Sequence, residues 1–140
     1  VLITPTHAWG KGLSEAEKIL ANCESVYTYG AHVAQMQNNN GLAVNLLFRT
    51  ARTTTALFMI SEVNGKVSGK KIKQFKQIHA KIKSKLDNQR TTILQEISAC
   101  DINALPITNQ VENKRKILWG RSFQEIQEQF LGKLKRTIGL

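Results

Sequence analysis

Residues 42–63 read LAVNLLFRTARTTTALFMISEV, a stretch that is apolar along most of its length. Its large side chains fall on nearly every side of a helical wheel, which predicts a helix buried all round. The β-branched run Thr53-Thr54-Thr55 is the weakest part, because such side chains lose conformational freedom in a helix. Strongly helical apolar sequence flanks this run, so we expect one central, buried second helix in the chain.

A first helix is predicted before this stretch. Ser14, with Glu17 three residues later, forms a capping-box pattern that marks its start. Apolar residues then recur at helical spacing until the asparagine-rich segment that Gly41 closes. Gly30 lies on this apolar stripe, where the missing side chain would let another helix approach closely.

Three further helices are predicted after the central one. The third covers residues 68–99, after the stop signal Asn64-Gly65. The fourth covers 110–119, and the fifth begins at Ser122 with a second capping-box pattern. No segment alternates as a strand would. The sequence therefore predicts an all-α protein, a compact bundle of about five helices in one domain over residues 1–140.

Two cysteines, Cys23 and Cys100, permit one intramolecular disulfide. The stretch Val1 to Ala8 resembles the end of a signal peptide, with small residues before Trp9, and residues 1–12 are expected to form an N-terminal arm. Together these features predict a periplasmic or secreted protein with one bridge. Two buried free thiols in a cytoplasmic protein are the alternative.

The charge balance favours anionic partners. Twenty Lys and Arg against ten Asp and Glu give a net charge of +10. The positive side chains are densest in the predicted third helix, and those proposed to bind an anion or a partner are Lys70, Lys71, Lys73, Lys76, Lys83, Lys85 and Arg90. A solvated face without binding function is the alternative, because no aromatic side chain is interleaved to stack on bases.

Arg49 and Arg52 pose a separate question. They interrupt the helix that is expected to be buried, and an arginine stays charged and needs a partner there. We predict a buried ion pair, with Glu24, Glu62 and Asp101 as candidate acids. An anion-binding pocket at the end of the bundle is the alternative.

No motif for catalysis, metal or cofactor binding is found. The sequence lacks CxxC, HxxxH, HExxH, GxSxG and phosphate-loop spacings. His79 lies on the apolar stripe of the third predicted helix and is interpreted as a packing residue. No stretch is apolar enough for a transmembrane helix, since the longest uncharged run contains several Gln and Asn residues.

The leading functional hypothesis is therefore an exported helical protein that acts by binding a macromolecule, in the manner of an inhibitor or immunity protein. Its expected partner is another protein, and a protein with an acidic surface is compatible with this hypothesis. A polyanion-binding module for nucleic acid or an anionic envelope surface is the second hypothesis. A hydrolase assembled from carboxylates on separate helices is the third, although no catalytic residue can be named.

Overall fold

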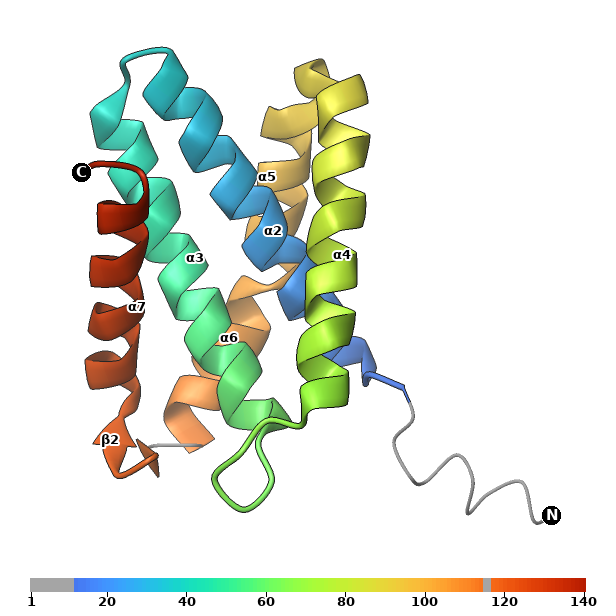
Figure 1. Cartoon of the computed structure of the whole chain (residues 1–140), viewed down its shortest axis with the longest axis vertical. Coiled ribbons are helices and arrows are strands. Elements are labelled where there is room, and N and C mark those ends of the chain that lie inside the picture. Colours follow the sequence, from blue (N-terminus) through green and yellow to red (C-terminus); the bar gives the residue numbers. More distant parts are fainter. Residues whose placement is uncertain (1–11, 115–116) are drawn as a thin grey trace, which may run out of the picture.

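The computed structural model describes residues 12–114 and 117–140, and these form a bundle of α-helices (Figure 1). In chain order the elements are α2 (Glu15–Met36), α3 (Asn40–Ser61), α4 (Gly69–Asn88), a 3-10 turn (Arg90–Thr92), α5 (Ile93–Asn103), α6 (Leu105–Lys114), β1 (Ile117–Leu118), β2 (Arg121–Ser122) and α7 (Phe123–Thr137). The predicted all-α bundle is confirmed. The predictions for Val1 to Trp9 lie outside the described residues.

Helix α3 forms the centre of the bundle. It packs against α2 on one side and α7 on the other, with α6 behind it (Figure 1). The threonine run does not break it, because Thr53 donates a hydrogen bond to the Arg49 carbonyl oxygen (2.7 Å) and Thr55 to that of Ala51 (2.7 Å). These buried hydroxyls are satisfied inside the helix. The predicted buried central helix is confirmed.

The predicted third helix over residues 68–99 is wrong in its length. Helix α4 ends at Asn88, and Gln89 leaves the helical conformation with φ −138° and ψ 55°. The 3-10 turn then reverses the chain, and α5 runs back behind α2 (Figure 1). The apolar stripe did not reveal this break because Ile93 and Ile97 pack against the core from α5, much as they would from a continuous helix.

The segment after α5 also departs from the sequence prediction. Helix α6 begins at Leu105 rather than 110, with Pro106 in its first turn, where a missing amide hydrogen breaks no helical bond. Residues 117–122, expected to contain no strand, form a β-hairpin. Its turn residues Trp119 and Gly120 have φ of 55° and 72°, and two positive values are what a type I′ turn requires.

A second turn of the same kind follows α3. Asn64 and Gly65 have φ of 54° and 80°, and the residues that flank them form an isolated antiparallel bridge. The pair is therefore not the predicted helix cap, because α3 already ends at Ser61. The Trp119 indole NH donates to the Gly65 carbonyl oxygen, so the two turns lie against each other.

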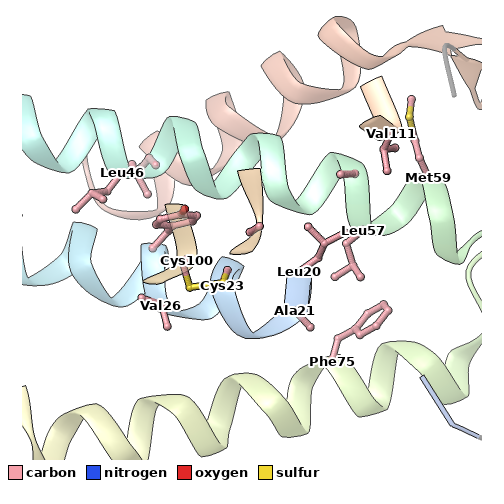
Figure 2. Packing of buried hydrophobic residues seen from close by; sticks show 14 of the residues in the cluster. Leu20, Ala21, Cys23, Val26, Leu46, Leu57, Met59, Phe75, Cys100 and Val111 are labelled. Atoms are coloured by element: carbon pink, nitrogen blue, oxygen red, sulfur yellow. A yellow bond between two sulfur atoms is a disulfide. The ribbon is translucent and has the colours of Figure 1, made fainter. Parts of the chain in front are cut away.

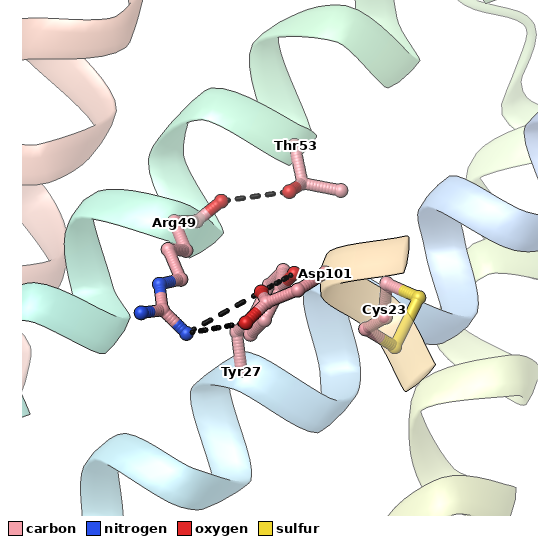
Figure 3. A network of polar contacts seen from close by, with 6 residues as sticks. Cys23, Tyr27, Arg49, Thr53 and Asp101 are labelled. Carbon is pink, nitrogen blue, oxygen red and sulfur yellow. Dashed lines mark hydrogen bonds and ion pairs between the residues drawn. A yellow bond between two sulfur atoms is a disulfide. The ribbon is translucent and has the colours of Figure 1, made fainter. Parts of the chain in front are cut away.

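Helix α5 is fastened to the bundle at one level. Cys23 and Cys100 form the predicted disulfide, with their Cα atoms 5.4 Å apart (Figure 2). One turn further along α2, the Tyr27 hydroxyl donates to Asp101 Oδ1 (2.6 Å), and Arg49 of α3 pairs with the same carboxylate at 3.1 Å (Figure 3). Covalent and ionic contacts thus join α5 to both α2 and α3.

Gly30 lies at a close approach of neighbouring helices, as its position on the apolar stripe predicted. A Cβ atom placed there would lie 3.0 Å from Ile97 Cδ1 of α5 and 3.2 Å from Leu46 Cδ1 of α3. The absence of a side chain lets both neighbours pack directly on α2.

Glu17 joins three helix ends at the other end of α2. Its side chain is 5% exposed and accepts hydrogen bonds from the Ser14 amide (2.9 Å), the Ser61 hydroxyl (2.6 Å) and Lys71 Nζ (2.7 Å). Burial alone would raise the pKa of Glu17. The bonds from Lys71, Ser14 and Ser61 and the charge of Lys71 outweigh burial and hold the pKa below its usual value.

Removing the disulfide should destabilise the fold strongly. The bridge closes a loop over a sequence separation of 77, and the chain-entropy model gives roughly 4 kcal/mol for a loop of this length. We expect Cys23→Ser/Cys100→Ser to lower the free energy of unfolding by about that amount in urea titrations. If the free energy of unfolding fell by less than about 1 kcal/mol, the bridge would not stabilise the fold by restricting the unfolded chain.

Replacing Glu17 by glutamine should also destabilise the fold. The variant keeps the shape but loses the charge that Lys71 and the buried Ser61 hydroxyl contact, so we expect unfolding free energy to fall by about 2 kcal/mol. The matched control is Glu15→Gln, since the Glu15 side chain is 85% exposed on the same helical turn. Equal effects of the two substitutions in urea titrations would contradict the role of Glu17.

Candidate ligand-binding groove and basic face

The lysines of α4 divide into two groups. Three of those predicted to bind an anion already have acidic partners: Lys71 with Glu17 at 2.7 Å, Lys83 with Asp87 at 3.1 Å and Lys85 with Glu96 at 3.4 Å. Arg90 donates to the Tyr29 hydroxyl (3.2 Å). These contacts reduce the charge that the predicted face offers to a partner.

The other predicted lysines remain available. These are Lys70, Lys73 and Lys76, and all three are exposed. Lys81, which was not in the predicted set, is exposed too. None of the four has an ion-pair partner within residues 12–114 and 117–140. Helical spacing places Lys70 and Lys73 on the side of α4 opposite Phe75, which is buried against the bundle, and places Lys81 beside them toward α5. We call these three residues the outer face of α4.

Arg49 and Arg52 each have a partner. The Arg49–Asp101 pair was among those predicted, whereas Arg52 pairs with Glu112 at 3.1 Å, an acid that the sequence analysis did not consider. The pairs are not fully buried, because the side chains of Arg49 and Arg52 are 36% and 18% exposed. The physical reason is that both arginines lie at the edge of α3, where α5 and α6 leave their charged ends accessible to water.

A groove of about 340 Å³ lies on the other side of α3, lined by side chains of α4 and α7. Its lining is mostly apolar and comprises Glu24 of α2, Thr50, Thr54, Leu57 and Phe58 of α3, Ile72, Phe75, Lys76 and His79 of α4, and Phe130, Lys133 and Leu134 of α7. The Phe58 ring centroid is 6.4 Å from that of Phe75 and 5.5 Å from that of Phe130. Aromatic side chains from three helices therefore meet in the lining of the groove.

Glu24 and His79 are the titratable pair inside this groove. Glu24 Oε1 lies 3.9 Å from His79 Nδ1, too far for a hydrogen bond, and the Glu24 side chain is 21% exposed. Burial raises the pKa of Glu24 to about 7. Burial, with repulsion from His32 and Lys83, lowers the pKa of His79, so its imidazole is neutral at neutral pH.

The other polar side chains of the lining are those of Thr50, Thr54, Lys76 and Lys133. The Thr50 hydroxyl donates to the Leu46 carbonyl oxygen (3.0 Å) rather than to Glu24 or His79. Within the part of the chain that the structure describes, no group of three His, Cys, Asp or Glu side chains could hold a metal ion. None of the described helices is long and apolar enough to cross a membrane.

Sequence reasoning missed Glu24 as a site residue and treated His79 only as a packing side chain. A signal was present: Glu24 lies two turns after Glu17 on one face of α2, where it interrupts an otherwise apolar surface. That His79 would face it could not be seen, because the pairing depends on how α4 packs against α2.

Comparison with known proteins adds no family to this description. Neither a protein-family model, nor a curated protein, nor a solved structure matches the chain.

Glu24 should make the fold less stable as pH rises. Its folded pKa is about 7 against an ordinary 4.5, so the folded state holds the proton more tightly and this stabilisation is lost between those pH values. We expect the free energy of unfolding of Glu24→Gln to equal that of the wild type at pH 4. At pH 8 it should be higher than that of the wild type by up to about 3 kcal/mol in urea titrations.

The control for this experiment is Glu128→Gln on the exposed side of α7. It should change stability little at either pH. A Glu24→Gln effect that is the same at pH 4 and pH 8 would contradict the raised pKa.

Proposed function

We propose that the protein is an exported binding protein that recognises an acidic partner protein through the outer face of α4. The observation that carries this proposal is a set of exposed lysines, Lys70, Lys73 and Lys81, that form no ion pair with any described residue, on a helix whose other side is anchored to the bundle. Complementary charge of this kind accelerates encounter and selects among partners. Inhibition of the partner is one form that such binding would take.

Three further features support a protein partner outside the cytoplasm. The Cys23–Cys100 bridge is typical of proteins from oxidising compartments. The outer face carries no aromatic side chain on which bases could stack, a feature that disfavours single-stranded nucleic acid. The groove and the basic face lack a nucleophile beside a base, which favours binding over catalysis.

A crosslinker on the outer face would test the proposal. Gln77 is exposed and lies among the three lysines, so a photoreactive amino acid at this position should form an adduct with the partner in the envelope or secreted fraction of the source organism. The same amino acid at exposed Gln124 of α7 is the positional control. We expect one discrete protein adduct from position 77. The same adduct should form when the purified partner is mixed with the crosslinker variant.

Charge reversal provides the matched comparison. Lys70→Glu/Lys73→Glu/Lys81→Glu should abolish the adduct, whereas Lys114→Glu/Arg121→Glu/Arg136→Glu, with the same net charge, should retain it. Raising salt should weaken the complex, because exposed charges are screened. A nuclease-sensitive adduct would overturn the proposal in favour of nucleic acid, and equal effects of the two triple variants would exclude the outer face.

A further inference from the structure

The groove between α4 and α7 has a different character from the outer face of α4. Its floor is formed by Leu57 and Phe58 of α3, and Phe130 contributes from α7. The Thr50 hydroxyl donates to the Leu46 carbonyl oxygen (3.0 Å), so its hydrogen is not available to a ligand in the groove. An apolar hollow of about 340 Å³ is close to the lower size limit of small-molecule sites, about 300 Å³.

Positive charge flanks this hollow from both walls. Lys76 of α4 and Lys133 of α7 line it, both are exposed, and neither has an ion-pair partner among the described residues. Two like charges that face one hollow are stabilised by an anion between them. The only acid of the lining is Glu24, whose burial favours the neutral form below pH 7.

We propose that this groove binds a single-chain anionic amphiphile, a free fatty acid, with its chain on Leu57, Phe58 and Phe130 and its carboxylate between Lys76 and Lys133. The apolar floor stabilises the chain by removing it from water. The contacts that Phe58 makes with Phe75 and Phe130 add aromatic surface on which the alkyl chain can pack. This site is independent of the proposed protein partner, because the outer-face lysines do not line it.

Calorimetry with dodecanoate, below its micelle concentration, is the direct test. We expect saturable binding with one ligand per protein, and at least tenfold weaker binding to Lys76→Ala/Lys133→Ala. The control Lys70→Ala/Lys81→Ala removes the same charge from the outer face and should change affinity by less than threefold. If both double variants weaken binding equally, the attraction is general and the proposed site is wrong.

The sign of the ligand charge gives a second test. Dodecyltrimethylammonium has the same chain with a cationic head and should bind at least tenfold more weakly than dodecanoate. Equal or tighter binding of the cation would overturn the proposal and would assign Glu24 as the group that recognises the head.

The pH dependence gives a third test, with dodecyl sulfonate as a ligand whose own charge does not change. The charged and titratable residues that line the groove together with Glu24 are Lys76 and His79 on α4 and Lys133 on α7, whereas the α3 residues of the lining are threonines and apolar side chains. His79, which lies 3.9 Å from Glu24, is itself under the influence of His32 on α2 and Lys83 on α4. We expect affinity to fall severalfold from pH 6 to pH 8 as Glu24 ionises, and Glu24→Gln to remove this fall. An unchanged slope in Glu24→Gln would contradict the placement of the ligand beside this residue.

The position of the ligand's alkyl chain can be located without any protein variant. A fatty acid with a diazirine in its alkyl chain should label the aromatic residues of the lining, Phe58, Phe75 or Phe130, as read by peptide mass spectrometry. Labelling confined to other surfaces would overturn the proposal even if dodecanoate binds.

Discussion

The covalent bond between Cys23 and Cys100 is the constraint on which the arrangement of the helices depends. Once the chain reverses after α4, nothing in the local sequence requires α5 to lie behind α2 rather than elsewhere on the bundle. The disulfide fixes that choice. Asp101, the next residue, then reaches Tyr27 and Arg49, so one covalent bond aligns a polar network that joins three helices (Figure 3).

Two glutamates on the same face of α2 show how packing sets chemistry. Glu17 accepts hydrogen bonds from the cap of its own helix and from residues at the end of α3 and the start of α4, and these contacts keep its pKa below the usual value. Glu24 is two turns further along and lies 3.9 Å from the imidazole of His79, and burial raises its pKa to about 7. The first serves structure, and the second leaves a responsive group in a groove.

Helix α4 presents different surfaces on its two sides, and this division is the basis of the two sites that we propose. Lys71 and Lys85 form ion pairs with acids of α2 and α5, whereas the lysines of the outer face form no ion pair with a described residue. Charge on the outer face suits a large acidic surface. Charge at the groove, beside an apolar floor, suits a small molecule with one polar end.

Local spacing and the cysteine count were enough to predict the all-α class, the buried α3, the capping boxes at Ser14 and Ser122 and the disulfide. The break at Gln89 depends on tertiary packing, since an apolar stripe has the same period in one helix or in two antiparallel ones. Tertiary packing also decided which lysines are paired and that Glu24 faces His79. Such contacts join residues far apart in the chain, and their existence follows from how helices pack, which no local pattern encodes.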